Sequence, residues 1–190
     1  AQKDGDHYIV NGQKTWTTLA QYADWIFCLV RTSNEGKKQE GISFLLIDMD
    51  TPGINIEPII NLEGSHELNQ VFFDDVRVPK VNRVGKENDG WSVAKYLLEF
   101  ERFSISSVEL RRLINRTRRL ANKPNTAGDS LASDSAFLGK LAQLEINALA
   151  METSEQRVLA NLSAGNRPGS VSSVLNAISA ETLQKADELA

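Results

Sequence analysis

The chain has 190 residues, a formal net charge of −4 and a sequence pI near 5.3. This length allows one large domain or two small ones, and the acidic balance argues against a nucleic acid or an anionic membrane surface as the main partner. No apolar run reaches the roughly 18 residues of a membrane-spanning helix, so we expect no membrane span. The single cysteine, Cys28, lies in an apolar run; we interpret it as a buried residue of a protein in a reducing compartment, with the cytoplasm as the default location.

Charge is distributed unevenly along the chain. Residues 1–90 carry 9 Lys and Arg against 14 Asp and Glu, whereas residues 91–190 carry 12 against 11. This change predicts a boundary between a domain of residues 1–90 and a domain of residues 91–190. The chain begins without a methionine and enters a strand pattern almost at once, so we expect it to be a piece of a longer protein.

Residues 11–18, Asn-Gly-Gln-Lys-Thr-Trp-Thr-Thr, are the most informative stretch of the first domain. Asn-Gly between two β-forming runs is a strong hairpin signal, because both central residues of a type I′ turn need positive φ. We therefore predict that residues 8–10 pair with residues 14–18. In such a strand Trp16 and Thr18 point to the same face, where a ring beside a hydroxyl could line a planar ligand. The alternative, which these residues alone favour, is that Trp16 is a packing residue and Thr18 a β-former.

Further β-forming runs follow, separated by turn-forming residues. They cover residues 22–31, 41–48, 54–59 and 68–79. The third of these runs contains Pro58, which cannot donate a hydrogen bond to a neighbouring strand, so we expect an edge strand there. Several short strands within this length predict a small antiparallel β-barrel or sandwich.

In the second domain the hydrophobic period changes from two to about 3.6, which predicts a helix from Trp91 onward. Its apolar stripe is formed by Ala94, Leu97, Leu98, Ile105 and Val108. Glu101 would lie in the middle of this stripe. A carboxylate on a buried face must be paired or carry a raised pKa, and either state suits a general base. The alternative is a structural ion pair with an arginine of a neighbouring helix, and periodicity does not separate the two.

The rest of the second domain is predicted to be helical as well. Ser133 is a candidate cap for a helix over residues 134–163, and a last helix covers residues 171–190. Helices joined by short links predict an incomplete antiparallel helical bundle, and hence an α+β multidomain fold. Five arginines are interpreted as a solvated or acid-paired helix face, with a phosphate contact as the alternative: Arg111, Arg112, Arg116, Arg118 and Arg119.

Other kinds of site leave no signal in the sequence. It has no metal-ligand cluster, no Ser-His-Asp set and no phosphate-binding glycine loop. His7 and His66 lie far apart on predicted turns, and each is interpreted as a surface residue.

Three stretches resemble the flavin-dependent acyl-CoA dehydrogenases. Residues 11–18, followed by Ala23-Asp24, resemble the family's N-G-x-K-x-W-[IT]-T and A-D. Residues 72–79 resemble its V-x-F-[DE]-x-V-x-V-P strand, and residues 98–102 resemble the L-x-x-E-R entry into its C-terminal helical domain. The three stretches follow each other in the family's order. The resemblance identifies residues 1–90 as a middle β-domain and residues 91–190 as part of the C-terminal helical domain.

The resemblance implies a cofactor, a reaction and site residues. The cofactor is FAD, with Trp16 and Thr18 against the isoalloxazine ring and Thr18 able to hydrogen-bond near N5. A carboxylate removes the α proton of an acyl-CoA thioester while a hydride leaves the β carbon, giving a trans-2-enoyl-CoA. Glu101 matches the glutamate that is the base in some members; in others the base is a Glu on a late helix. Arg102 is a candidate for contacting CoA or a neighbouring acid.

The resemblance also implies partners and a cellular role. These are an electron-transfer flavoprotein as electron acceptor, a homo- or hetero-oligomer, and a place in lipid metabolism and fatty acid oxidation. The family's T-E-P-x-[AG]-G-S-D, Q-R-x-x-F-G and Y-E-G-T stretches are not found in this chain. The alternatives are a flavin oxidase or monooxygenase on the same scaffold, and a non-catalytic subunit or binding module of the same shape. Acyl-chain length is not indicated.

Overall fold

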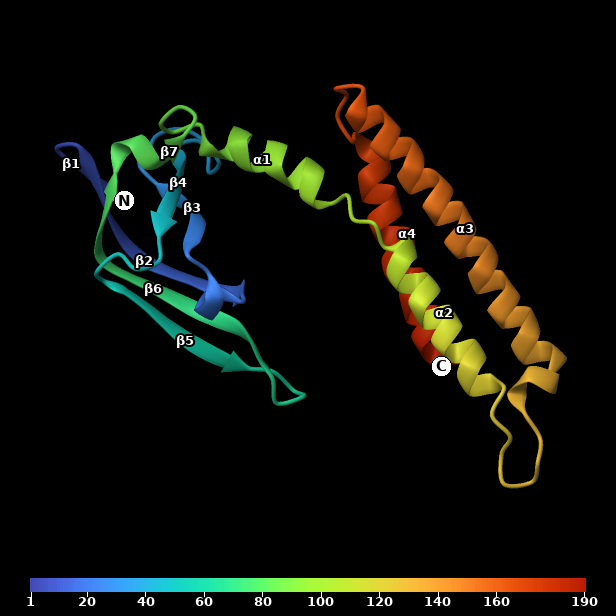
Figure 1. Cartoon of the computed structure of the whole chain (residues 1–190). Helices are drawn as coiled ribbons and strands as arrows, with labels where there is room; N and C mark the ends of the chain where they lie inside the picture. The colour runs from blue at the N-terminus through green and yellow to red at the C-terminus, as the bar shows by residue number, and fades with distance from the viewer. The chain divides into compact units, whose positions relative to one another are not determined.

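The computed structural model describes all 190 residues of the chain (Figure 1). It consists of two compact units, Ala1–Tyr96 and Leu97–Ala190. The first unit is built mainly from strands and the second from helices. Antiparallel sheets followed by helices confirm the predicted α+β fold class.

The strands of the first unit form two antiparallel sheets, and neither sheet closes on itself. Of the two predicted alternatives, a closed barrel is therefore not formed. The order is β1-β2-β6-β5 in the four-stranded sheet and β3-β4-β7 in the three-stranded sheet. The bounds are β1 (Gln2–Asp4), β2 (His7–Thr18), β3 (Trp25–Arg31), β4 (Ile42–Asp48), β5 (Ile54–Ile60), β6 (His66–Pro79) and β7 (Arg83–Val84).

Residues from both sheets form one hydrophobic core in this unit. Tyr8 and Leu45 are completely buried, and Cys28 is 2% exposed, which confirms its predicted burial. Side chains alternate between the two faces of a strand, so every second residue of β3 and β4 contributes to this core. The buried members are Tyr8, Val10, Ala20, Cys28, Val30, Leu45, Ile47, Met49, Val71, Phe73, Val76 and Val78.

The predicted hairpin at Asn11-Gly12 is wrong. β2 continues through both residues and pairs with β6, which follows some 60 residues later. The dipeptide instead lies at a shift in the β2–β6 register, where Gly12 has a φ of 137°. Asn11 and Asp75 exchange two hydrogen bonds across the bulge: Asn11 Nδ2 donates to Asp75 Oδ1 at 2.9 Å, and the Asp75 amide donates to Asn11 Oδ1 at 2.8 Å. Turns and bulges both use residues that tolerate positive φ, so the dipeptide alone does not distinguish them.

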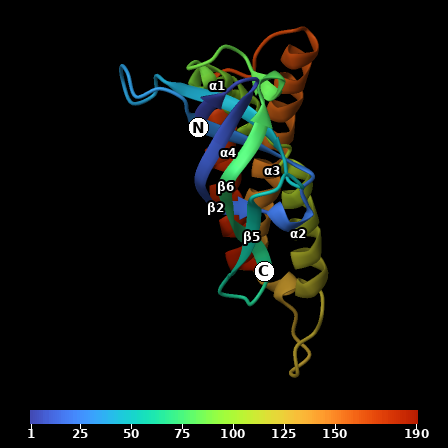
Figure 2. The same ribbon diagram turned by 90° about the vertical axis from the view of Figure 1, so that its left-hand side faces the viewer.

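β5 lies at the edge of the four-stranded sheet, as Pro58 predicted. Figure 2 shows β2, β6 and β5 side by side in this sheet. Pro58 lies opposite Asn69 of β6 in the register of the two strands. An edge strand tolerates a residue without an N–H group because one of its sides has no neighbouring strand.

The helices are α1 (Gly90–Glu101), α2 (Ser107–Ala121), α3 (Ser135–Ser163) and α4 (Ser170–Leu189). Three short 3₁₀ turns cover Ala20–Tyr22, Lys80–Asn82 and Leu131–Ser133. α2, α3 and α4 share a core that includes Leu110, Leu141 and Met151. None of the helices combines the length and the hydropathy that a membrane crossing requires.

Ion pairs show that α2 and α3 run antiparallel. Arg111 pairs with Glu152, and Arg118, two turns further along α2, pairs with Glu145, two turns earlier in α3. Arg112 also faces an acid, Glu109 of its own helix, at 3.7 Å. The acid-paired interpretation therefore holds for these three of the five arginines.

The helix predicted from Trp91 onward is interrupted, contrary to prediction. α1 ends at Glu101, and the chain is not helical again until Ser107. The carboxylate of Glu155, a buried residue of α3, accepts hydrogen bonds from the amides of Ser106 at 2.9 Å and Ser107 at 3.0 Å, and from the Ser107 hydroxyl. These amides are among the groups that lack partners at the start of a helix, so Glu155 stabilises a new helix start here.

The cap of α3 is Asp134 and not the predicted Ser133. Asp134 Oδ1 accepts hydrogen bonds from the amides of Ala136 at 2.8 Å and Phe137 at 3.4 Å. Ser133 belongs to the preceding 3₁₀ turn, where its hydroxyl donates to the carbonyl of Ser130 at 2.7 Å. Aspartate and serine are comparable caps, so neighbouring candidates are not separated by sequence.

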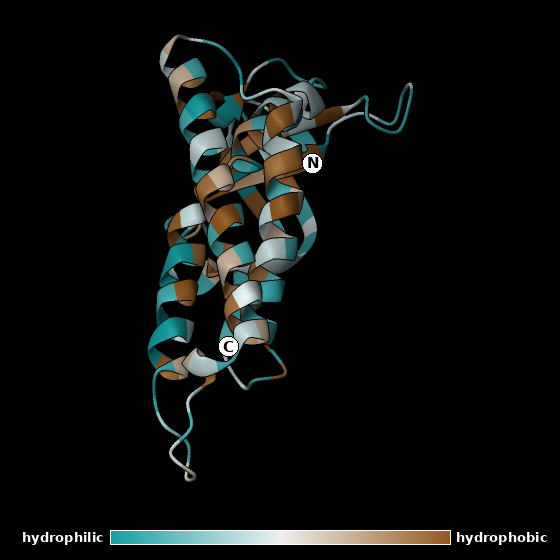
Figure 3. Ribbon diagram, turned by 90° about the vertical axis from the view of Figure 1, so that its right-hand side faces the viewer, coloured by the Kyte–Doolittle hydropathy of each residue, from teal (hydrophilic) through white to brown (hydrophobic).

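The surface of the helical unit is apolar in part. Figure 3 shows hydrophobic residues recurring at intervals along the ribbons of the helices. On α4, Val171, Val174 and Ile178 are spaced at helical intervals and exposed, and on α3 so are Ile146 and Leu149. Exposed apolar side chains grouped in this way are typical of contact surfaces.

Candidate functional site

Trp16 stands out in the first unit because a large apolar side chain is exposed in a strained backbone. Its side chain is 66% exposed, and its φ of 64° lies in the left-handed region. The strain follows from a second shift in the β2–β6 register, between Lys14 and Thr17. A non-glycine residue in this region costs about 1–3 kcal/mol, and such residues cluster at functional sites. Trp16 is not a packing residue of the core.

Thr18 is also exposed, at the last position of β2. The bulge interrupts the alternation of side chains before Thr17, so strict alternation no longer places Trp16 and Thr18 on one face. What the structure shows is a ring and a hydroxyl two residues apart, both open to solvent. Leu19, the next residue, is a second non-glycine residue in the left-handed region, with φ of 54°.

Other aromatic side chains of this unit are exposed as well. Tyr22 and Trp25 follow Trp16 closely in the chain and are both more than half exposed. Phe27 is exposed and stacks on the buried ring of Phe44, with 5.3 Å between the ring centroids and 12° between the planes. The first unit therefore presents several aromatic rings to solvent near the Trp16 end of β2 and in β3.

Glu101 is exposed, so its predicted burial is wrong. The prediction extended one apolar stripe through Ile105, but α1 ends at Glu101 itself and Ile105 lies outside a helix and is half exposed. No ion pair with an arginine is found either. The structure thus places an accessible carboxylate at the C-terminal end of α1.

Arg102 follows Glu101 and is exposed too. It lines a pocket of about 330 Å³ together with Glu99, Arg167 and the first turn of α4. Glu99 Oε2 lies 3.5 Å from Arg167 Nη1. Two guanidinium groups and the amide end of a helix suit an anionic group, and one carboxylate offsets part of that charge. Sequence reasoning missed Arg167, because it lies in a loop that carries no motif.

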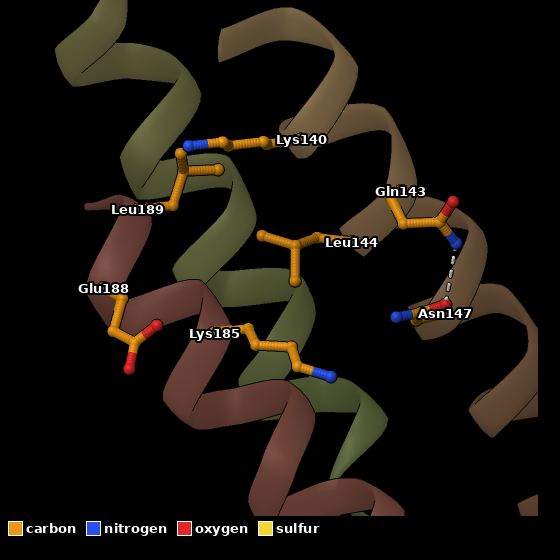
Figure 4. Close-up of a pocket in the computed structure, with 7 residues that line it drawn as sticks. All are labelled: Lys140, Gln143, Leu144, Asn147, Lys185, Glu188 and Leu189. Atoms are coloured by element: carbon orange, nitrogen blue, oxygen red, sulfur yellow. Dashed lines mark hydrogen bonds between the residues drawn. The ribbon is translucent and has the colours of Figure 1, made fainter. Parts of the chain in front are cut away.

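A second pocket of the helical unit, of about 380 Å³, lies between α3 and α4 (Figure 4). Lys140 of α3 and Lys185 of α4 reach into it on either side of Leu144. Gln143 and Asn147 line the α3 side and are joined by a hydrogen bond of 3.1 Å. The candidate site residues Trp16, Thr18, Glu101 and Arg102 do not line this pocket.

The four residues that the resemblance assigns to cofactor, base and substrate fall into two pairs that are close in the chain. Trp16 and Thr18 lie at the end of β2 in the first unit, and Glu101 and Arg102 lie at the end of α1 in the second. Within each unit the two members are accessible and close in the chain. Each pair is therefore available to a ligand on its own unit.

Comparisons with known families match almost the whole chain. The family model of the acyl-CoA dehydrogenase middle domain matches residues 1–76, and that of the acyl-CoA dehydrogenase C-terminal domain matches residues 88–190.

The chain is also similar to individual proteins of Mycobacterium tuberculosis. It is 41% identical to acyl-CoA dehydrogenase IpdE1 over 138 residues, which are 73% of this chain and 35% of that protein. It is 49% identical to acyl-CoA dehydrogenase FadE29 over 102 residues, which are 54% of this chain and 26% of that protein. The chain thus spans about a third or less of these curated relatives.

Among solved structures, the chain resembles one in the crystal structure of the ChsE4–ChsE5 complex from Mycobacterium tuberculosis. The TM-score is 0.84 at 32% sequence identity, and the match covers 99% of this chain and 49% of that chain. Both units take part in the match, because it covers nearly all of the residues.

Proposed function

Since the chain belongs to the acyl-CoA dehydrogenase family, we propose that the protein converts an acyl-CoA thioester to a trans-2-enoyl-CoA with FAD as its cofactor. The observation that carries this proposal is the exposed ring of Trp16 in a left-handed backbone, two residues from Thr18. Strained residues cluster at functional sites, and a large exposed apolar ring is typical of a surface that a ligand or partner covers, so the ring of Trp16 supports a ligand site here.

The chemistry of Trp16 and Thr18 fits a flavin. An isoalloxazine ring is a flat aromatic system, so its face can pack on the indole ring, and the Thr18 hydroxyl can donate a hydrogen bond to a ring nitrogen. The chemistry that bound FAD supplies is acceptance of a hydride. Trp16 and Thr18 bind and orient the ring, and the indole excludes water from the face that it covers.

Glu101 is proposed as the general base. Its carboxylate oxygen takes the α proton of the thioester, and the electron pair of that C–H bond becomes the Cα=Cβ double bond as the β hydrogen leaves with its own pair. The support for this role is the match of Glu101-Arg102 to the family's E-R pair and the accessibility of the carboxylate. Burial of Glu101 does not support it, because the side chain is exposed.

Arg102 is proposed to bind the CoA part of the substrate. CoA carries phosphate groups, and a guanidinium group binds phosphate through paired hydrogen bonds. The pocket that Arg102 lines with Arg167 supports this role, since it brings two guanidinium groups to one opening.

The wider proposals follow from the family. Residues 1–90 are the middle domain and residues 91–190 part of the C-terminal domain. Electrons pass to an electron-transfer flavoprotein, and the protein acts in lipid metabolism in the cytoplasm. It assembles as a homo- or hetero-oligomer, which the similarity to a chain of a two-protein complex and the exposed apolar side chains of α3 and α4 support.

The proposed function is tested by absorption spectroscopy. The purified protein is expected to be yellow, and its visible flavin band should bleach when a suitable acyl-CoA is added. Glu101→Gln should keep the flavin band and lose bleaching, because the amide cannot take the α proton. Glu109→Gln is the matched control; it changes an exposed carboxylate of α2, and should bleach like the wild type.

Normal bleaching by Glu101→Gln would exclude Glu101 as the base. A colourless protein that still binds CoA thioesters would favour the non-catalytic alternative. Oxygen consumption without an added electron acceptor would indicate the oxidase or monooxygenase alternative.

A further inference from the structure

The segment from Trp16 to Leu19 needs support from elsewhere in the first unit. Both of its ends are non-glycine residues with positive φ, 64° and 54°. Residues held in this region persist only where the surrounding structure fixes them. One such restraint is the amide of Leu19, which donates to the carbonyl of Glu67 at 2.8 Å.

A second restraint is Asn69, a completely buried residue of β6. Its side-chain nitrogen donates to the carbonyl of Thr17 at 3.1 Å and to Oε1 of Gln21 at 2.6 Å. Thr17 is the middle of the strained segment, so this bond holds the segment between its two left-handed residues. Asparagine is rare inside strands, and its presence here at full burial calls for a polar role.

The bonds of Asn69 form a closed ring with Gln21 and His66. Nε2 of Gln21 donates to the carbonyl of His66 at 3.0 Å, and Nε2 of His66 lies 2.7 Å from Oδ1 of Asn69. A backbone carbonyl can only accept, so the nitrogen of Asn69 must face Thr17 and its oxygen must face His66. His66 Nε2 therefore carries a proton. Both N–H groups and the oxygen of the buried amide are satisfied, which fixes its orientation.

We propose that Asn69, locked by Gln21 and His66, is a positioning residue that holds Trp16 and Thr18 in their exposed arrangement and so sets how they meet the flavin. In this role Asn69 acts through its hydrogen bond to the carbonyl of Thr17 and not by contact with the flavin or the substrate. The flavin part of this inference rests on the proposed function, whereas the restraint on the Trp16–Leu19 segment does not.

Asn69→Asp tests the restraint, because it keeps the size of the side chain and removes both N–H donors. NMR spectra of the full chain contain indole signals from Trp16, Trp25 and Trp91, and Trp16→Phe identifies the first. Asn69→Asp should shift the Trp16 signal alone and speed hydrogen exchange of the Leu19 amide roughly tenfold. A role in general stability would instead speed exchange throughout the unit.

Asn55→Asp is the matched control. It makes the same chemical change in the same sheet, at an exposed residue of β5 bonded to Glu57 at 3.2 Å. It should leave the Trp16 signal and the Leu19 exchange rate unchanged. If Asn69→Asp does not fold, Gln21→Met opens the ring while leaving the bond from Asn69 to Thr17, and should produce a smaller change of the same kind. Unchanged Trp16 and Leu19 signals in the folded variant would overturn the proposal.

Titration with FAD tests the flavin part on the same variants. Asn69→Asp should weaken FAD binding roughly tenfold, the effect expected when one ordered contact is lost, and Asn55→Asp should bind like the wild type. Equal FAD binding by Asn69→Asp, with Trp16 displaced, would overturn the positioning of flavin by Asn69. Absence of FAD binding in the wild type would contradict the proposed function, while the NMR measurements still decide the restraint.

Discussion

In the proposed flavin site, the exposed side chain of Trp16 contacts the ligand and the buried side chain of Asn69 fixes the backbone that carries it. Trp16 offers a ring to solvent, and Asn69, completely buried, holds the backbone one residue away. Asn69 was not recognised in the sequence, because its meaning depends on pairing β6 with a strand some 50 residues earlier. The resemblance to a family identified Trp16 and Thr18, but a motif does not show what fixes them.

The ion pair between Glu87 and Lys3 allows a test of how a single charged pair contributes to stability. Its carboxylate lies 2.7 Å from Lys3 Nζ and accepts a hydrogen bond from the hydroxyl of buried Tyr8 at 3.2 Å. The hydrogen bond from Lys3 is the main cause that lowers the pKa of Glu87 from its ordinary value of 4.5. A lowered carboxyl pKa means that stability is gained above the unfolded pKa and lost as pH falls through the folded one.

We therefore expect Glu87→Gln to be less stable than the wild type at about pH 7 and equally stable in strong acid. The bond to Glu87 also raises the pKa of Lys3, so the wild-type advantage should decline again as pH rises through the raised Lys3 pKa. Thermal unfolding followed by tryptophan fluorescence across this pH range measures the difference. Glu57→Gln, at an exposed position of β5, is the control. A difference that does not change with pH would contradict the ionic origin.

At the scale of elements, helix ends were the least predictable feature. The apolar pattern after Trp91 continues through Ile105, yet the helix stops at Glu101 because Glu155 caps a new start at Ser106 and Ser107. That cap comes from almost 50 residues away, and no local pattern reports it. The edge position of β5 was predictable, since a single residue, Pro58, excludes the alternative.

Gly90 and Gly139 provide a matched pair of helical glycines. A Cβ on Gly90 would lie 2.5 Å from the amide nitrogen of Phe44 and 2.5 Å from the carbonyl carbon of Ser43, which are backbone atoms of β4. A Cβ on Gly139 of α3 would meet nothing within 4 Å. Gly90→Ala should destabilise the first unit by about 1–3 kcal/mol through overpacking. Gly139→Ala should stabilise α3 by up to about 1 kcal/mol, because alanine favours the helix.

Urea unfolding measures both glycine variants. The decisive result is that the change in the free energy of unfolding has opposite signs in the two variants, because both replace a glycine by alanine. If Gly90→Ala were neutral or stabilising, the close approach of α1 to β4 within the first unit would be wrong.

For the whole molecule, the sequence was sufficient to predict the secondary-structure class of each unit, strands in the first and helices in the second, but not which strands pair. The change in hydrophobic period predicted strands before helices, because each period follows from local geometry. The pairing of β2 with β6 was not predicted. Instead, Asn11-Gly12 was interpreted as a hairpin turn that would pair residues 8–10 with residues 14–18, which both belong to β2. Pairings of this range depend on the complete core and not on the residues nearby.

Each unit has its own hydrophobic core, and this predicts how the chain unfolds. Leu45 is completely buried in the core of the first unit, and Leu110 in that of the second. Replacing either by alanine should cost about 2–5 kcal/mol, from lost burial and the cavity left behind. We expect each loss to appear in the unfolding transition of its own unit, because each cavity weakens one core only.

Two spectroscopic signals separate the units in this experiment. All three tryptophans, Trp16, Trp25 and Trp91, lie within Ala1–Tyr96, so tryptophan fluorescence reports on the first unit. The helical signal in circular dichroism comes mostly from α2, α3 and α4 of the second. Leu45→Ala should therefore shift the fluorescence transition and Leu110→Ala the circular dichroism transition. Equal shifts of both signals in either variant would mean that the two cores unfold as one, because only coupled cores transmit a cavity from one unit to the other.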